Sequence, residues 1–352
     1  MGDTDSATAP PFDPVPNDRA TVLDPAWLAT ALDGIGDRDR VVAVDEVGET
    51  RTIAQKLRFR VTVEGDDGVT RTDAYCVKAH FDEEGPGSLG PEANYYRTLD
   101  PWLRVRTPAI AYSAFDESTG RGLIVMEDVI ANGGRFLDAH QPYSVDTTRD
   151  SLGQLAQLHA ATWGNPRPSG CDWLMPKIAL MADRYPAEAL QGWLDDGRGP
   201  DVAPELRDAG LLLDAMRATA ALPETCVLHG DTHSGNVYLD AQGRACWLDW
   251  QVVQPGHWSV DVAYHLSTVL DVETRRTQEE DLLRYYLEVL AAAGVDAPSF
   301  DAAWDAYRGG FTHGFFLWTI TTVSSRAVVL IHFPRIATAM TDHETYRRLG
   351  VV

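Results

Sequence analysis

The sequence predicts an α+β fold of two lobes: an N-lobe with an antiparallel sheet and one main helix, and a larger, mostly helical C-lobe. Segments rich in β-branched residues dominate up to Asp128, whereas the segments after it have helical periods. The chain has 352 residues, more than one ordinary domain of about 100–200 residues. We therefore expect the N-lobe at residues 19–128 and the C-lobe at residues 129–352. Residues 1–18, rich in Pro, Asp and Ser, have the composition of a disordered leader.

The N-lobe is expected to begin with a short helix, because Asp24 can cap its first turn and Pro25 suits the first helical position. Three β-rich segments follow, separated by glycine-containing turns, which is typical of an antiparallel meander. The main helix begins at Pro91 with Glu92 in its first turn, where an acid complements the helix dipole. The expected strands are residues 41–47, 51–63, 69–79, 109–114 and 122–126.

Helical periods characterise the C-lobe, and one short strand-rich insert lies among its helices. The expected helices are residues 151–162, 176–194, 202–221, 279–293 and 299–330. The insert comprises residues 226–228, 237–239 and 245–248. The apolar stretch at residues 315–331 contains Ser324, Ser325 and Arg326, so it falls short of the ~20 apolar residues of a membrane span. We expect a buried helix there.

The composition limits the partners and the compartment. A formal net charge of −22 disfavours nucleic acids and anionic membranes, because both require a basic surface. The four cysteines are scattered and form no CxxC pair, which argues against a zinc site and a disulfide framework. We expect no signal peptide, since no cationic start precedes an apolar run. A reducing, cytoplasmic location fits best, and the oligomeric state is left open.

The segment from residue 226 to residue 251 carries the polar residues on which a functional hypothesis depends. An apolar strand ends at His229-Gly230-Asp231, a tight loop reaches Asn236, and a second apolar strand delivers Asp249. Phosphoryl transfer needs a carboxylate that accepts or orients the acceptor's proton, and oxygen ligands that hold magnesium on nucleotide phosphates. Kinases place such an Asp and an Asn on one loop and a further Asp at a strand end. Asp231, Asn236 and Asp249 have this order, and the first two have the kinase spacing.

The motif H-G-D-x-H-x-x-N at residues 229–236 resembles the hallmark loop of the aminoglycoside phosphotransferase superfamily, which includes choline-, fructosamine- and ecdysteroid-kinase-like branches. Further similar segments are Leu248-Asp249-Trp250-Gln251, Pro255-Gly256 and Asp261-Val262-Ala263. The resemblance covers about residues 40–340 and is strongest over residues 226–266, and Gln251 resembles the ecdysteroid-kinase-like branch most. It implies a bilobal protein-kinase-like fold and an enzyme that depends on ATP and Mg²⁺.

The resemblance also implies roles for individual residues of the C-lobe. Asp231 would be the catalytic base, and Asn236 and Asp249 would be the magnesium ligands. Three further residues would support the catalytic loop: His229, His233 and Asp261. Of these, Asp261 would be a buried acid that braces the loop, and His233 would either orient the loop or touch the substrate.

For the N-lobe, the resemblance implies that Lys78 reaches the α- and β-phosphates of ATP and that Glu92 is its ion-pair partner. The hinge, where backbone groups meet adenine, would consist of Met126, Glu127 and Asp128. A phosphate-covering loop is expected around residues 48–52, where the amide of Thr50 could cradle phosphate. This loop departs from the family pattern, because it holds only one glycine. ATP is expected to lie between the lobes.

Three alternative interpretations compete with a kinase. Asp231 and Asn236 could merely satisfy the hydrogen bonds of a turn. The glycine-poor loop at residues 48–52 also leaves open a pseudokinase that binds nucleotide without turnover. A metallophosphoesterase is a third alternative, because Asp138-x-His140 and Asp231-x-His233 imitate its metal ligands, although its later histidine ligands are missing.

Two other classes fit less well. Residues 85–90 match the G-x-G-x-x-G motif of dinucleotide-binding folds, but charged residues separate them from the preceding strand. A protein kinase needs a long activation segment after its metal-binding Asp, whereas only eleven residues separate Asp249 from Asp261. We therefore predict a kinase that phosphorylates a hydroxyl of a small molecule. The acceptor, the choice between ATP and GTP, and a role in resistance or metabolism are left open.

Overall fold

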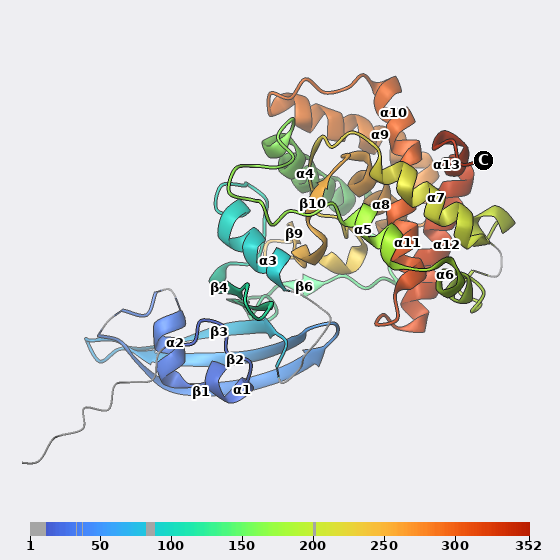
Figure 1. Cartoon of the computed structure of the whole chain (residues 1–352). Helices are drawn as coiled ribbons and strands as arrows, with labels where there is room; N and C mark the ends of the chain where they lie inside the picture. The colour runs from blue at the N-terminus through green and yellow to red at the C-terminus, as the bar shows by residue number, and fades with distance from the viewer. Residues whose placement is uncertain (1–11, 33, 37, 82–88, 200–201) are drawn as a thin grey trace, which may run out of the picture. The chain divides into compact units, whose positions relative to one another are not determined.

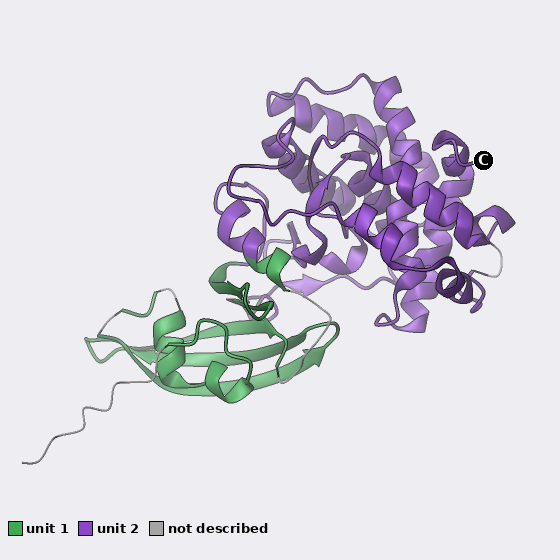
Figure 2. Ribbon diagram, viewed as in Figure 1, with its two compact units in different colours: residues 1–93, 109–128 green, residues 94–108, 129–352 purple. Residues whose placement is uncertain are grey.

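The computed structural model describes residues 12–32, 34–36, 38–81, 89–199 and 202–352. The chain divides into two compact units (Figure 2): residues 1–93 with 109–128 form unit 1, and residues 94–108 with 129–352 form unit 2. Unit 1 contains a five-stranded antiparallel sheet and unit 2 is mainly helical, so the predicted α+β fold is confirmed. Of the expected leader, residues 1–11 lie outside the described part of the chain, and Val15 packs in the core of unit 1.

The sheet of unit 1 has the strand order β1-β2-β3-β5-β4, and every neighbouring pair is antiparallel. Its strands are β1 (Arg40–Arg51), β2 (Gln55–Glu64), β3 (Thr70–Ala79), β4 (Ile110–Asp116) and β5 (Arg121–Glu127). All five predicted strands are present, but β1 is longer than expected. A bulge before Gly48 lets β1 stay paired with β2 as far as Arg51. The expectation of a loop at residues 48–52 is therefore wrong: Thr50 lies in β1 opposite Lys56, and the turn is at residues 52–54.

One face of this sheet is apolar and forms the core of unit 1. Alternate residues of β2 are buried, as a strand covered on one face requires: Leu57, Phe59, Val61 and Val63. The short helices α1 (Arg19–Val22) and α2 (Pro25–Ala31) cover this face (Figure 1), and Trp27 of α2 is part of the core. The carboxylate of Asp24 caps α2, as predicted, by accepting the amide of Ala26 at 2.7 Å. Lys56 and Lys78 fall on the opposite face by the same alternation.

The helix predicted from Pro91 is α3 (Gly90–Asn94), most of which belongs to unit 1, and it continues in unit 2 as the π-helical turn η1 (Tyr95–Leu99). Helices make up most of unit 2. The other helices are α4 (Val145–Thr162), α5 (Lys177–Arg184), α6 (Ala187–Leu194), α7 (Ala209–Ala220), α8 (Ser259–Val269), α9 (Val272–Ala292), α10 (Phe300–Gly309), α11 (Thr312–Ile320), α12 (Arg326–Asp342) and α13 (Thr345–Arg348). The sequence did not predict α8. The single helix expected at residues 299–330 is divided among α10, α11 and α12, with breaks at Gly310 and at residues 321–325.

Short strands carry the segment that the sequence singled out. β7 (Cys226–Leu228) pairs with β10 (Gln254–Gly256) in antiparallel fashion. β8 (Val237–Leu239) pairs with β6 (Arg135–Phe136) and with β9 (Ala245–Trp247). Every residue of β7, β8, β9 and β10 is buried. The loops that leave β7 and β9 therefore start from fixed positions in the core.

The apolar stretch near the C-terminus and the cysteines were both subjects of sequence-based expectations. The apolar residues at 315–331 are divided between α11 and α12, where Phe315 and Phe316 are buried. Within the described residues, no helix combines the length and the apolarity needed to cross a membrane. All four cysteines are free thiols.

Candidate active site

The loop that follows β7 is shaped by one glycine. Gly230 has a φ of +81°, and a Cβ atom at this position would lie 2.3 Å from the carbonyl oxygen of Val252. The backbone conformation and the neighbouring segment therefore both exclude a side chain. The loop ends in the 3₁₀ helix η3 (Ser234–Asn236), where the hydroxyl of Tyr143 donates to the carbonyl oxygen of Ser234 at 2.6 Å.

His229 is fully buried and uses both ring nitrogens. The amide of Asp231 donates to Nδ1 at 3.2 Å, so the ring proton is on Nε2, which donates to the carbonyl oxygen of Leu248 at 3.0 Å. Burial lowers the pKa of His229, which keeps the ring neutral. His229 thus connects the loop after β7 to the residue that precedes Asp249.

The carboxylate of Asp231 accepts hydrogen bonds from two different elements. The hydroxyl of Tyr264 donates to Oδ1 at 3.0 Å, and Asn236 Nδ2 donates to Oδ2 at 3.1 Å and to the backbone carbonyl of Asp231 at 2.8 Å. His233 Nε2 lies 3.6 Å from Oδ2, and His233 Nδ1 accepts the amide of Gly235 at 3.0 Å. The side chain of Asp231 is 23% exposed, so a ligand can reach it.

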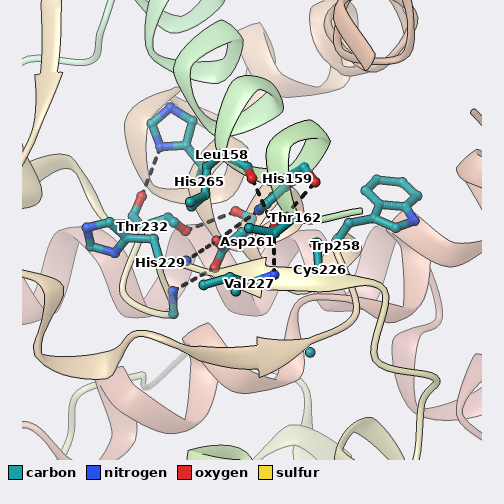
Figure 3. Close-up of polar contacts among 12 residues, drawn as sticks. Leu158, His159, Thr162, Cys226, Val227, His229, Thr232, Trp258, Asp261 and His265 are labelled. Atoms are coloured by element: carbon teal, nitrogen blue, oxygen red, sulfur yellow. Dashed lines mark hydrogen bonds and ion pairs between the residues drawn. The ribbon is translucent and has the colours of Figure 1, made fainter. Parts of the chain in front are cut away.

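Asp261, in α8, holds the same loop through its backbone (Figure 3). Its Oδ2 accepts the amide of His229 at 2.7 Å, and its Oδ1 accepts the amide of Gly230 at 2.9 Å. His159 Nε2 lies 3.2 Å from Oδ2, and the hydroxyl of Thr232 donates to the carbonyl oxygen of Asp261 at 2.9 Å. Burial alone would raise the pKa of Asp261, but the hydrogen bond with His159, electrostatic interactions with the neighbouring histidines and the amide of Gly230 together outweigh it, so the pKa lies below its ordinary value. A buried, ionised carboxylate therefore orients two consecutive amides of the loop.

Asp249 follows β9 in a backbone conformation that non-glycine residues rarely adopt. Its φ and ψ are both 66°, in the left-handed region. The next residue, Trp250, is fully buried, and its ring stacks on that of Tyr95 at a centroid distance of 3.7 Å. Lys177 Nζ donates to the carbonyl oxygen of Gln251. Strained residues persist where the surrounding packing holds them, and they concentrate at functional sites.

Asn236 and Asp249, the predicted magnesium ligands, each carry a side-chain oxygen. Both hydrogen bonds from the Asn236 amide use Nδ2, which identifies Oδ1 as the atom that could bind a metal. Mg²⁺ prefers oxygen ligands and is usually held by one or two protein side chains together with waters and substrate phosphates. A larger metal cluster is not formed: in the part of the chain that the structure describes, no three or more His, Cys, Asp or Glu side chains could hold a metal ion together.

The ion pair that the sequence predicted in unit 1 is present. Lys78 Nζ lies 2.6 Å from Glu92 Oε2, and the two side chains are 2% and 1% exposed. An unpaired charge is costly to bury, so each of these groups stabilises the charged form of the other. Lys56 lies directly across from Lys78 on the neighbouring strand, and its Nζ donates to the hydroxyl of Thr52 at 3.3 Å. Two lysines thus share one face of the sheet next to the turn at residues 52–54.

The expected hinge lies at and just after the end of β5. The amide of Glu127 donates to the carbonyl oxygen of Ala109 at 2.8 Å, and Glu127 Oε1 accepts the amide of Ala109 at 3.0 Å. Asp128 is 2% exposed and accepts a hydrogen bond from Arg58 Nε at 2.8 Å. The amide of Asp128 donates to the carbonyl oxygen of Ala74 at 2.9 Å. Adenine recognition by backbone groups of Met126, Glu127 and Asp128 stays a prediction.

Sequence reasoning missed two residues that lie beside the predicted site residues. Tyr264 follows Asp261 by three residues, which puts both on one side of a helix, but α8 itself was not predicted. Lys56 could have been found by counting back along both strands from the turn between β2 and β3, which fixes their register.

The glycine motif of the dinucleotide-binding alternative is at residues 85–90, and most of it lies outside the described residues.

The metallophosphoesterase alternative depended in part on Asp138 and His140. Asp138 Oδ1 lies 2.7 Å from His140 Nδ1 and accepts the amide of His140 at 2.9 Å. Both side chains are more than half exposed. The pair is therefore the hydrogen-bonded turn that an Asp two residues before a polar residue commonly forms.

A sheet-bearing unit with a buried Lys–Glu pair, together with a helical unit that has an Asp–Asn loop and a strand-end Asp, defines the class of kinase-like phosphotransferases. Residues 51–308 of the chain match the phosphotransferase enzyme family (APH), and the chain belongs to this family. A search of curated proteins gave no match.

Solved structures that resemble the chain share little sequence with it. LicA, the choline kinase of Streptococcus pneumoniae, in complex with AMP has 14% identity and a TM-score of 0.50, and the match covers 91% of this chain and 97% of LicA. Spectinomycin phosphotransferase APH(9)-Ia, in complex with ADP and spectinomycin, has 11% identity and a TM-score of 0.46, with 91% and 97% covered. Macrolide 2'-phosphotransferase MphH from Brachybacterium faecium has 18% identity and a TM-score of 0.39, with 92% and 98% covered. At these identities the similarity shows the fold alone, and the likeness to the ecdysteroid-kinase-like branch stays a prediction.

Proposed function

We propose that this chain is an ATP- and Mg²⁺-dependent kinase that transfers the γ-phosphate to a hydroxyl of a small molecule. One observation carries the proposal. The buried carboxylate of Asp261 orients the amides of His229 and Gly230, and the loop fixed in this way presents Asp231 with Asn236 hydrogen-bonded to it. Phosphoryl transfer depends mainly on positioning and on electrostatic stabilisation, so a rigid loop of this kind suits it.

In unit 2, Asp231 accepts or orients the proton of the acceptor hydroxyl. Its side chain is partly exposed, and each of its carboxylate oxygens accepts one hydrogen bond. Asn236 Oδ1 and Asp249 hold Mg²⁺, which neutralises negative charge on the phosphates when it is bound. His229 and Asp261 keep this loop in place, and His233 orients it through the Gly235 amide.

In unit 1, Lys78 contacts the α- and β-phosphates, and Glu92 holds its ammonium group. The distance of 2.6 Å and the burial of both side chains support this assignment. Backbone groups of Met126, Glu127 and Asp128 recognise adenine, and the turn at residues 52–54, rather than the strand residue Thr50, covers the phosphates. The AMP bound to LicA, a protein of the same fold, supports an adenine nucleotide as the ligand.

A small acceptor is favoured over a protein acceptor by the segment between Asp249 and Asp261. It holds only the 3₁₀ helix η4 (Trp250–Val252), the buried strand β10 and the first residues of α8. A protein kinase needs a long activation segment there to bind a peptide. The relatives with the same fold act on choline, spectinomycin and macrolides, as their names state.

An ATP-to-ADP assay with Mg²⁺ against a panel of alcohols tests the proposal. The panel should contain amino alcohols, sugars, amino sugars and sterol-like alcohols. We expect at least one member to raise ADP release well above the rate with water, and Asp249→Asn to abolish the increase. Nucleotide binding without acceptor-dependent turnover would favour the pseudokinase alternative. If the protein showed no nucleotide binding and no turnover, the proposed function would be rejected.

A further inference from the structure

Tyr264, in α8, contacts Asp231 from within the core of unit 2. Its side chain is 1% exposed, and its hydroxyl lies 3.0 Å from Asp231 Oδ1. The facing helix α11 approaches the ring so closely that a Cβ atom at Gly314 would lie 2.4 Å from Tyr264 Cδ2. Packing against this glycine therefore determines where the hydroxyl lies.

The hydroxyl of Tyr264 is a donor to Asp231. Burial, and after it the negative charge of Asp231, raise the pKa of Tyr264 well above its ordinary value, so the phenol keeps its proton. Asn236 Nδ2 donates to the other carboxylate oxygen. Each oxygen of Asp231 thus has one fixed donor, one from α8 and one from η3, and two such donors define the plane of the carboxylate.

We propose that Tyr264 is a positioning residue for phosphoryl transfer: its hydroxyl fixes the plane of the Asp231 carboxylate, so that a remaining lone pair faces the acceptor hydroxyl. This inference rests on the proposed function, in which Asp231 accepts or orients the acceptor proton. The terminal torsion of an Asp side chain has broad minima, so a carboxylate with a single donor can rotate. Correct orientation of a reacting group contributes strongly to rate, and Tyr264 acts through Asp231 rather than on a reacting atom.

Tyr264→Phe tests the inference, because it removes the hydroxyl and keeps the ring against Gly314. We measure ADP release from Mg²⁺-ATP, with water as the acceptor and with any alcohol that the panel identifies. We expect kcat to fall about tenfold or more while the KM for ATP is unchanged, since only the orientation of Asp231 is affected. A kcat equal to that of the wild type would overturn the inference.

Tyr307→Phe is the matched control. It removes an equally buried hydroxyl that donates to a carboxylate, Glu279 Oε2, at 2.9 Å in the same unit. We expect its kcat to equal that of the wild type, so a general loss of buried hydroxyl groups cannot explain the effect of Tyr264→Phe. Equal losses of kcat in the two variants would contradict a specific role for Tyr264.

An NMR measurement tests the hydrogen bond between Tyr264 and Asp231 without turnover, so a failure of this contact can be told apart from a failure of the proposed function. A buried hydroxyl proton donated to a carboxylate exchanges slowly with water, and its resonance is identified by its loss in Tyr264→Phe. We expect Asp231→Asn, which replaces a charged acceptor with a neutral one, to move this resonance upfield. A resonance that is absent in the wild type, or unmoved by Asp231→Asn, would overturn the inference.

Discussion

The loop after β7 and the turn between β1 and β2 are both proposed to serve phosphoryl transfer, yet they are held in different ways. Buried groups hold the loop: Asp261 accepts two consecutive amides and His229 Nδ1 accepts a third. The turn at residues 52–54 is closed by a hydrogen bond of 3.1 Å between the amide of Thr52 and the carbonyl oxygen of Ala54, and Ile53 at its tip is 52% exposed. The groups assigned to chemistry are therefore positioned by the core, whereas the segment assigned to cover phosphate lies at the surface.

The largest effect is expected at the centre of the loop. Asp231→Asn keeps the shape of the side chain but removes its basicity, and kcat should fall by about 10²–10⁴-fold, the usual contribution of a general base. The fold should persist, because the amide still accepts a hydrogen bond from Tyr264. ADP release measured under saturating ATP checks this. Asp240→Asn, in the hairpin between β8 and β9, should keep the wild-type kcat, and equal activity in both variants would reject the role of Asp231.

Gly230→Ala tests whether the loop depends on its backbone conformation. The new Cβ would meet the carbonyl oxygen of Val252, and the positive φ would be strained, so we expect a loss of about 2–4 kcal/mol in the free energy of unfolding. Activity should fall with it, since the amide of Gly230 is one of those that Asp261 orients. Chemical denaturation measures the change. A variant as stable as the wild type would show that the loop adapts more freely than its contacts indicate.

Acid should weaken the loop through His265, which is fully buried. His265 Nδ1 donates to the carbonyl oxygen of Thr232 at 2.9 Å, and burial lowers the pKa of His265 from 6.5 to about 4. As the pH falls, the unfolded chain therefore binds a proton at this histidine before the folded chain does. The fold keeps its full stability above about pH 6.5 and loses on the order of 3 kcal/mol as the pH falls from about 6.5 towards 4.

Thermal unfolding between pH 7 and pH 4.5 measures this dependence on pH. His265→Gln should flatten the decline of the melting temperature, because the glutamine does not titrate in this range. The exposed His140 is the matched position, and His140→Gln should leave the slope unchanged. Equal slopes for wild type and His265→Gln would assign the acid sensitivity to other groups.

On the side of the turn, Lys56→Met should weaken phosphate binding moderately. Lys56 shares a sheet face with Lys78, and its ammonium group reaches Thr52 in the turn. Loss of one partly exposed charge should weaken ATP binding on the order of fivefold, whereas binding of adenosine should not change. Calorimetry with both ligands measures the difference, with Arg60→Met on the same strand as the control. Equal weakening of ATP and adenosine would contradict a phosphate contact.

The smallest effect is expected from Gly48→Ala, the counterpart of Gly230→Ala. Among the described residues, no atom lies within 4 Å of a Cβ built at Gly48, and its φ is not positive. The free energy of unfolding should change by no more than about 0.5 kcal/mol, and the KM for ATP should stay within about twofold. A large rise in KM would show that the only glycine of this segment has a role in covering phosphate that its surroundings do not reveal.

Much of the fold followed from sequence patterns, and the exceptions have physical reasons. The strands of unit 1 were predicted because β-branched residues and glycine-containing turns mark them. α8 was missed because all eleven of its residues are buried, so no apolar stripe distinguishes one side of the helix. The break between α10 and α11 was missed because it depends on a long-range contact, in which a Cβ at Gly310 would lie 2.3 Å from the carbonyl oxygen of Ser259.

The residues of the candidate site also divide into those that local patterns predict and those that depend on long-range contacts. Asp231 and Asn236 could be predicted because their spacing within one loop is a local property of the chain. Lys78 and Glu92 could be paired by their order along a strand and a helix. The contact of Tyr264 with Asp231 could not be predicted, since it requires the register of a helix that has no periodic pattern and the close approach of α11 at Gly314.

The loop containing Asp231 is proposed to transfer phosphate from ATP to an alcohol. The most direct test is a product balance: Mg²⁺-ATP is incubated with each alcohol of the panel, and ADP and phosphorylated alcohol are quantified together by mass spectrometry. We predict equal amounts of the two products with at least one alcohol, and neither product above background with Asp231→Asn. Release of ADP with inorganic phosphate alone, or phosphorylated alcohol formed equally well by Asp231→Asn, would contradict this role of the loop.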